Sequence, residues 1–309
     1  MHTNQVQYVS IDSDSASQRL DNYLICKLKG VPRSHIYQII RSGQVRVNKG
    51  RKKINYRLQP GDNIRIPPIK TATTSPNKAP EKFQQFLQSR IIHEDEHILI
   101  LNKPSGYAVH GGSGLSFGII ESLRESRTDI RFMELVHRLD KETSGCLVIA
   151  KNKTTLRELN EALRLRKIEK KYLAIVHNKW ELGTKIVDAP LNKNTLKGGE
   201  RIVSVNSNGK EAQTKFSAIQ SCTSISLIQA TPYTGRTHQI RVHAATCNHS
   251  IVGDKKYTTS QATSATSKRL MLHARSICIE INNKEFKIKA PVDKDFNDKL
   301  LQYGLNTVL

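Results

Sequence analysis

The segment LVHRLDKETSGCLVIAK, residues 135–151, places Asp140 in a polar turn between two apolar runs. A fixed carboxylate at such a point can act as a nucleophile or a base, or can stabilise a developing positive charge. Local structure also explains the same turn, because Asp, Thr, Ser and Gly favour turns between strands. The spacing alone leaves both interpretations open, so the rest of the chain must decide between them.

The composition is that of a globular chain with a strong positive charge. With 309 residues, of which 37% are hydrophobic, the chain is long enough for about two domains with ordinary cores. The 49 Lys and Arg outnumber the 27 Asp and Glu, which gives a formal net charge of +22. This surplus predicts a polyanionic partner. Nucleic acid fits better than a membrane, because the sequence contains no basic amphipathic helix with large apolar residues.

The first residues and the cysteines indicate a cytoplasmic protein. The start, MHTNQVQYVSIDSDSAS, lacks the basic and apolar regions of a secretory signal, and no apolar run approaches the roughly 20 residues that span a bilayer. The five cysteines stand singly without a C-x-x-C pair, which matches neither a zinc site nor a disulfide framework. We therefore expect buried thiols and no metal site.

Residues 10–70 are expected to form a small basic module. Apolar residues at helical spacing predict a helix in QRLDNYLICKLKG, which ends at Gly30. Pro32 opens a second predicted helix, RSHIYQIIRSG, which ends at Gly43. The period then changes to two in QVRVNKGRKK, and LQPGDNIRIPP predicts a turn and a short strand. Through residue 70 the chain contains six Lys and seven Arg against four Asp, with the cations clustered on the second helix and the turn after it.

A linker and a larger domain follow the module. Residues 71–85 are rich in Thr, Ser, Pro and Lys without periodicity, which is typical of flexible linkers. Residues 86–309 mix short strands with helices, and the lack of regular alternation favours an α+β fold over a doubly wound sheet. We expect strands in HILILNK, LVHRLD, GCLVIAK, KKYLAIVHN, ISLIQATP, LMLHARSICIEI and EFKIKAP, and helices in TTLRELNEALRLR and GRTHQIRVHAATC.

Several common catalytic motifs are absent from the sequence. The glycine-rich segment HGGSGLSFG contains neither G-x-G-x-x-G nor a Walker pattern, and it lacks the G-x-S-x-G of hydrolases. HRLD matches part of a kinase catalytic loop, but no Asn follows at the required spacing and no D-F-G is present. We expect Gly111–Gly118 to form a mobile or closely approached loop, either beside a substrate or away from it.

Long segments of the chain resemble two known families. RLDNYL, VPRSHIYQIIRSGQVRVNKG and LQPGDNIRI resemble the S4 RNA-binding domain over nearly the whole module. The RluA family of pseudouridine synthases has three signature segments, which resemble HRLDKETSG (His137–Gly145), KKYLAIV (Lys170–Val176) and TGRTHQIRVHAATCNHSIVGD (Thr234–Asp254). With LNKPSGYAVHGGSGLSFG and DAPLNKNTLKGGERIVSV added, the whole chain is similar to family members that act on 23S ribosomal RNA. The resemblance implies a small α/β S4-like domain followed by a catalytic domain with a mixed, largely antiparallel sheet.

The resemblance also assigns a role to Asp140. Members of the family break the bond between ribose C1′ and uracil N1 and rejoin the base through C5, so positive charge develops on the sugar. Asp140 would attack C1′, stabilise that charge or remove the 2′ proton, and the sequence leaves these alternatives open. No cofactor or metal is implied, because the reaction is an isomerisation.

Three further residues match active-site positions of the family. Arg241 would pair with Asp140, since a guanidinium can bind a carboxylate at two points and keep it ionised. Tyr172 would stack on the uracil, while its hydroxyl meets a polar partner. Arg138 would fill the space left when the uridine is extruded from its stack. Arg138, Arg241 and Tyr172 also have structural explanations, as a salt bridge, a surface cation and a core residue.

The remaining expectations concern binding. The module is expected to contact RNA phosphates through Arg33, Arg41, Arg46, Lys49, Arg51 and Lys52. Arg236 and His238 match the third signature segment without an assigned task, and His243 is expected to be structural. The expected partner is 23S ribosomal RNA or a large-subunit precursor, bound by a monomer, with no role for DNA or membrane.

A non-catalytic RNA-binding or ribosome-assembly factor is the main alternative. The presence of Asp140, Tyr172 and Arg241 together argues against it, because a degenerate relative would be expected to have lost one of them. A DNA-binding regulator is disfavoured, because the sequence shows neither a dimer-spaced helix-turn-helix nor a zinc finger.

Overall fold

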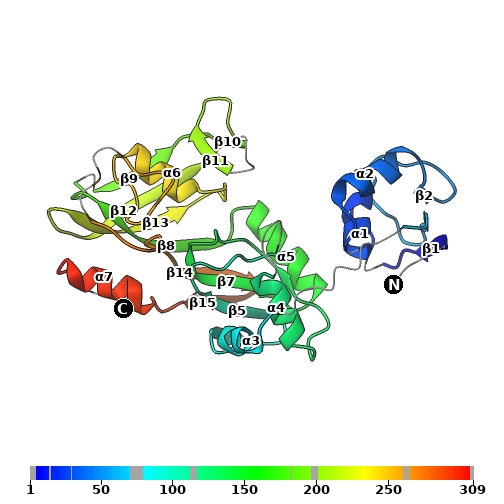
Figure 1. Cartoon of the computed structure of the whole chain (residues 1–309), viewed down its shortest axis with the longest axis horizontal. Coiled ribbons are helices and arrows are strands. Elements are labelled where there is room, and N and C mark those ends of the chain that lie inside the picture. Colours follow the sequence, from blue (N-terminus) through cyan, green and yellow to red (C-terminus); the bar gives the residue numbers. More distant parts are fainter. Residues whose placement is uncertain are drawn as a thin grey trace. The chain divides into compact units, whose positions relative to one another are not determined.

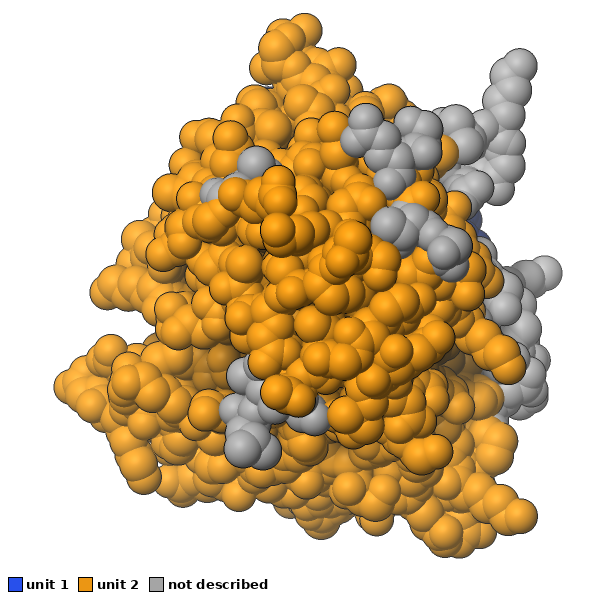
Figure 2. Space-filling view, turned by 90° about the vertical axis from the view of Figure 1, so that its left-hand side faces the viewer, with its two compact units in different colours: residues 1–76 blue, residues 77–309 orange. Residues whose placement is uncertain are grey.

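The chain folds into two compact units, residues 1–76 and 77–309, which are described separately below (Figure 1). Figure 2 colours unit 1 blue and unit 2 orange. The computed structural model describes residues 5–13, 15–28, 30–69, 79–111, 117–181, 183–195, 201–259, 262 and 265–306. Among these residues, no helix has the length and apolar character needed to cross a membrane.

Unit 1, as far as it is described, consists of two helices on a three-stranded antiparallel sheet (Figure 1). Its elements are β1 (Gln7–Ser10), α1 (Leu20–Lys27), α2 (Arg33–Arg41), β2 (Arg46–Val47) and β3 (Asn63–Ile66). The sheet order is β1-β3-β2. Leu24 of α1 and Ile36 and Ile40 of α2 are buried with Val47 and Ile64 of the sheet. The helical apolar spacing of the sequence therefore forms the core of this unit.

Unit 2 is built on a mixed sheet that has ten strands within the described residues (Figure 1). Its main path is β4-β5-β7-β14-β8-β13-β12-β9, with β15 paired to β14 and β6 paired to β7. The strands are β4 (Ile91–Glu94), β5 (Ile98–Lys103), β6 (Glu134–Leu135), β7 (Ser144–Ala150), β8 (Glu169–His177), β9 (Thr184–Asp188), β12 (Gln213–Ser221), β13 (Ile225–Pro232), β14 (Leu272–Ile281) and β15 (Lys284–Lys289). A separate hairpin pairs β10 (Leu191–Thr195) with β11 (Arg201–Val205).

Helices cover both faces of this sheet, which explains its uninterrupted apolar strands. The helices are α3 (Glu81–Gln88), α4 (Ile119–Ser126), α5 (Lys153–Arg164), α6 (Gln239–Thr246) and α7 (Lys294–Gln302). All residues of β5 and β7 are buried. Along β7, Val148 shares a core cluster with Leu159 of α5, whereas Leu147 and Ile149 share the other with residues of α3, α4 and α7. Alternate side chains thus face opposite layers.

Gly145 permits the parallel pairing at the centre of the sheet. β7 and β14 run parallel, and the other pairings of the described sheet are antiparallel. Gly145 has φ +106°, and a Cβ atom there would lie 2.2 Å from the carbonyl oxygen of Ala274 on β14. Only glycine allows this approach, so the residue that ends HRLDKETSG anchors the start of β7.

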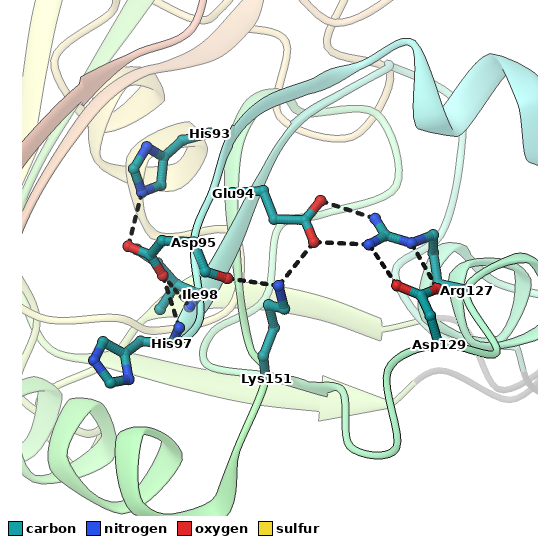
Figure 3. Close-up of polar contacts among 8 residues, drawn as sticks. All are labelled: His93, Glu94, Asp95, His97, Ile98, Arg127, Asp129 and Lys151. Carbon is teal, nitrogen blue, oxygen red and sulfur yellow. Dashed lines mark hydrogen bonds and ion pairs between the residues drawn. The ribbon is translucent and has the colours of Figure 1, made fainter.

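A polar network fixes the edge hairpin of the sheet (Figure 3). Both carboxylate oxygens of Glu94 on β4 accept hydrogen bonds from Arg127 at 2.8 Å, and one also accepts from Lys151 at 2.8 Å. The hydrogen bonds from Arg127 are the largest cause of a low pKa for Glu94, about 2, although burial opposes them. This network joins β4 to the residues that follow α4 and β7, and it steadies the hairpin whose second strand ends at Lys103.

The α+β fold with a mixed, mostly antiparallel sheet is confirmed, and three local expectations are corrected. Residues 81–85 of the predicted linker belong to helix α3, and residues 71–78 lie outside the described part of the chain. Of the strand expected in LVHRLD, residues 135–140, only Leu135 lies in a strand, β6. Of the five cysteines, Cys146 is buried, Cys26 is exposed and the others are intermediate, so the expectation of buried thiols holds for Cys146 alone.

Candidate active site

Asp140 lies in the tight turn between β6 and β7. The N–H of Thr143 donates to the carbonyl of Asp140 at 3.1 Å, which closes the turn. Leu139 is buried next to it, whereas the Asp140 side chain keeps 31% of its exposure. The turn therefore presents a partly exposed carboxylate at the edge of a fixed core.

Lys103 holds this turn in place through hydrogen bonds to backbone carbonyls. Its ammonium group is fully buried and donates to the carbonyls of Pro104, Tyr107 and Lys141 at 2.7–2.9 Å. Burial lowers the pKa of Lys103 to about 7, against the attraction of nearby carboxylates. Ser105 adds a hydrogen bond from its hydroxyl to the carbonyl of Glu142 at 2.6 Å. The end of β5 thus fixes the backbone on the C-terminal side of Asp140.

His137 fixes the other side of the turn. Its Nε2 accepts a hydrogen bond from the backbone N–H of Val148 at 3.1 Å, and the N–H of Val136 donates to the carbonyl of Val148 at 3.0 Å. Burial is the main cause that lowers the pKa of His137 to about 4. The ring is therefore neutral near pH 7 and works as a structural acceptor.

Helix α6 brings two basic side chains to Asp140. His238, the residue before the helix, has a left-handed backbone with φ 54°, and Arg241 lies in the first turn. Nε2 of His238 is 3.9 Å, and Nη1 of Arg241 is 3.7 Å, from Oδ2 of Asp140. Gln239 secures the start of the helix, because its side-chain oxygen accepts from the Thr234 hydroxyl at 2.7 Å.

The two-point ion pair expected between Arg241 and Asp140 is instead made with Asp254. Nε and Nη2 of Arg241 each donate to one carboxylate oxygen of Asp254 at 2.7 Å, and both side chains are nearly inaccessible. Burial alone would raise the pKa of Asp254, but the hydrogen bonds from Arg241 hold it below its ordinary value. Asp254 also accepts the N–H groups of Lys256 and Tyr257. Arg241 is thereby fixed, and only Nη1 is directed at Asp140.

Tyr172 stands on β8 in the same site. Its side chain is 8% exposed, and it pairs across the sheet with Ala230 and Ala274. Burial is the main cause that raises the pKa of its hydroxyl, and the charge of Asp140 acts in the same direction. The phenol therefore stays protonated and can donate a hydrogen bond.

Two cavities meet at Asp140. The first, of about 670 Å³, is also lined by Tyr172, and the second, of about 480 Å³, is also lined by basic residues. Both volumes are typical of ligand pockets. Residues that line both are Arg138, Leu139, Asp140, His238 and Arg241; further Lys and Arg residues of the second cavity are Lys141, Lys255, Lys256, Lys268 and Arg269. The exposed Arg138 therefore stands where the two cavities join.

The other predicted residues differ in their place: Arg236 lines the first cavity, whereas His243 lines neither cavity. Arg236 is exposed and donates to the carbonyl of Glu211 at 2.9 Å. His243 is fully buried between the Thr214 hydroxyl and the carbonyl of Ala189. The structure describes only the ends of the predicted Gly111–Gly118 loop, because residues 112–116 lie outside the described part.

The six cations predicted in unit 1 are spread over its surface. Arg46 and Lys49 line one groove together with Tyr8 and Arg65. Arg41, Arg51 and Lys52 line a second groove, and Arg33 begins helix α2. The structure therefore does not join these six residues into one pocket.

Comparisons with known proteins identify the family of the chain. Residues 97–246 match the family model of RNA pseudouridylate synthases, and residues 18–64 match the S4 domain. "Ribosomal large subunit pseudouridine synthase C" of Yersinia pestis is 46% identical over 100% of both chains. The protein of the same name from Escherichia coli (strain K12) is 46% identical over 94% of this chain and 95% of its own. The chain therefore belongs to the RNA pseudouridylate synthase family and carries an S4 domain.

A solved structure supports the fold assignment. Human RNA pseudouridylate synthase domain containing 4 superposes with a TM-score of 0.63 at 26% identity, covering 73% of this chain and 97% of that chain. The sequence resemblance to pseudouridine synthases with an N-terminal S4 domain is thus confirmed, and so is the expectation of an enzyme of this class.

Proposed function

We propose that the protein isomerises specific uridines of 23S ribosomal RNA to pseudouridine, with Asp140 as the catalytic carboxylate. One observation carries the proposal: Asp140 is a partly exposed carboxylate at the junction of two cavities, faced by Arg241 and His238. The choice of substrate is supported by the names of full-length relatives, which are large-subunit synthases.

The chemistry needs a carboxylate against the ribose. The C1′–N1 bond of the uridine breaks, the base turns, and a C1′–C5 bond forms; C5 then loses its proton and N1 gains one, so the product is an isomer of the substrate. Asp140 acts at the sugar, where positive charge develops, as nucleophile, as counter-charge or as base for the 2′ proton. Nη1 of Arg241, at 3.7 Å, places a positive charge beside this carboxylate.

The two cavities fit an extruded nucleotide. Tyr172 lines the first cavity and offers its ring to the uracil and its protonated hydroxyl to a polar group of the base. Arg138 is exposed at the junction of the cavities and can enter the space that the uridine leaves in its stack. The basic residues of the second cavity then face the RNA backbone.

Unit 1 would anchor the enzyme on the RNA. Its proposed phosphate contacts are Arg33, Arg41, Arg46, Lys49, Arg51 and Lys52, on the S4 domain that the comparisons identify. In this proposal residues 10–70 bind RNA, and residues 86–309 carry out catalysis. The enzyme acts as a monomer in the cytoplasm, on 23S ribosomal RNA or a large-subunit precursor.

The test is a reaction with purified full-length protein and unmodified transcripts of 23S and 16S ribosomal RNA. Pseudouridines are then mapped on both transcripts at nucleotide resolution. The proposal expects pseudouridine at discrete sites of the 23S transcript and none on the 16S transcript. Pseudouridine on the 16S transcript alone would overturn the assigned substrate. So would the absence of pseudouridine from both transcripts and from large-subunit precursor particles.

A further inference from the structure

Tyr257 contacts Nδ1 of His238, the ring nitrogen that does not face Asp140. Nδ1 of His238 lies 2.7 Å from the Tyr257 hydroxyl, and the backbone N–H of Val203 donates to the same hydroxyl oxygen at 3.0 Å. Because a backbone N–H can only donate, the hydroxyl oxygen accepts from Val203 and its own hydrogen is free to point at Nδ1. In that arrangement Nδ1 acts as an acceptor, and the proton of the neutral ring lies on Nε2.

The contact between His238 and Asp140 favours the same tautomer. Nε2 is 3.9 Å from Oδ2 of Asp140, so the other tautomer would turn a lone pair toward a carboxylate. The His238 side chain keeps only 12% of its exposure, and its ring meets the ring of Tyr257 edge-on, with centroids 5.6 Å apart. Burial, the largest cause, lowers the pKa of His238, which agrees with a neutral ring at pH 7.

The backbone of His238 also indicates a held position. Its φ of 54° lies in the left-handed region, which residues with a Cβ atom rarely adopt. Such strain persists only where the surroundings enforce it, and it is found at functional sites. Gln239, the next residue, supplies one restraint because its side-chain nitrogen donates to the carbonyl of Gln213 at 2.9 Å.

We propose that His238 is a positioning residue for Asp140, kept as the Nε2–H tautomer by the Tyr257 hydroxyl. His238 and Arg241 both approach the same oxygen, Oδ2. In this proposal the two contacts hold the carboxylate with Oδ1 toward the ribose. The contact of 3.9 Å shortens when substrate closes the site, because catalytic hydrogen bonds are often long in free enzymes. This inference rests on the proposed role of Asp140.

A double-mutant cycle tests whether Tyr257 acts on the reaction through His238. Single-turnover rates at saturating 23S RNA are compared for wild type, Tyr257→Phe, His238→Ala and the double variant, with His97→Ala as a surface histidine control. We expect Tyr257→Phe to slow the reaction about 10-fold, as for one lost hydrogen bond, and His238→Ala to slow it about 100-fold. The double variant should match His238→Ala within about twofold, because Tyr257 acts through His238.

Independent roles would give a different pattern. If the two single effects multiply in the double variant, Tyr257 does not act through His238, and the inference fails. If the wild type is active and His238→Ala reacts at the same single-turnover rate, the inference is also wrong, but the proposed function stands. An inactive wild-type enzyme would instead count against the proposed function.

The tautomer itself can be observed. In protein labelled with ¹⁵N-histidine, the His238 signals should show a protonated Nε2 and an unprotonated Nδ1. Tyr257→Phe should shift the population toward the Nδ1–H form, whereas His97 signals should not change. A protonated Nδ1 in the wild-type enzyme would overturn the proposed orientation.

Discussion

Replacing Arg241 with Met should reverse the pH dependence of stability in unit 2. In the wild type, Arg241 holds the pKa of the buried Asp254 below its ordinary value of 3.8. A depressed carboxyl pKa contributes stability that is present above the ordinary pKa and lost as pH falls through the folded one. Without the guanidinium, burial is the largest remaining effect and raises the pKa of Asp254, against the hydrogen bonds from the N–H groups of Lys256 and Tyr257. The variant is then weakest at neutral pH and regains stability as the carboxyl is protonated.

The magnitude follows from the burial of the pair. The Arg241 and Asp254 side chains are 8% and 0% exposed, and two hydrogen bonds of 2.7 Å join them. Removing one partner of a buried pair costs about 3–5 kcal/mol. Arg241→Met should therefore lower the free energy of unfolding by about this amount at pH 7.

The compensating change is Asp254→Asn in the same chain. An amide oxygen can still accept the N–H groups of Lys256 and Tyr257, and it carries no charge. The double variant should recover at least half of the loss at pH 7 and show little change in stability between pH 7 and pH 5. Its activity should stay low, because Asp140 still lacks the cation at 3.7 Å.

Urea unfolding at pH 7 and pH 5, with single-turnover rates on 23S RNA, measures both effects. If Arg241→Met loses less than about 1 kcal/mol at pH 7 and keeps the pH slope of the wild type, the Asp254 carboxylate does not depend on Arg241. Recovery of activity in the double variant would show that Arg241 acts only as a structural partner.

Three further outcomes are expected. Gly145→Ala should destabilise unit 2 by at least about 2 kcal/mol in urea unfolding, because its Cβ would meet the carbonyl of Ala274; a neutral effect would contradict the close approach. Arg138→Ala should slow single turnover at least tenfold on a base-paired target uridine but little on an unpaired one, and equal losses would argue against a role in extrusion. Deleting residues 1–76 should weaken RNA binding and flatten its dependence on salt in binding titrations, and an unchanged slope would refute the anchor.

The central strands could be predicted from the sequence because they are buried on both faces. β5 contains the apolar run ILIL and β7 the run CLVIA, and α5 has an apolar side at helical spacing. Helix α3 could also be predicted from the sequence, since Pro80 precedes it and Phe83 and Leu87 are four residues apart. The Thr-, Ser- and Pro-rich composition of the preceding segment extends the predicted linker over the first residues of α3 and hides the start of this spacing.

The supports of the site were harder to predict. Asp140, Tyr172 and Arg241 stand in matching signature segments, so they could be named together. Asp254 ends the third signature segment, but its pairing with Arg241 depends on how the chain turns after α6, which the sequence does not show. Lys103 was missed for a similar reason, because lysines are almost never buried and its three carbonyl acceptors come from turns.

The role of Asp140 is tested most directly by the single-turnover rate of Asp140→Asn on a 23S RNA fragment that contains a mapped target uridine. The substitution keeps the size of the side chain and removes its charge. RNA affinity should stay within a few fold of the wild type, because the proposed phosphate contacts are untouched. We predict that pseudouridine formation falls by at least about 10³-fold, as for loss of a nucleophile or its charge. Turnover above a few per cent of wild type, in a sample whose Asn has not deamidated to Asp, would contradict the assignment.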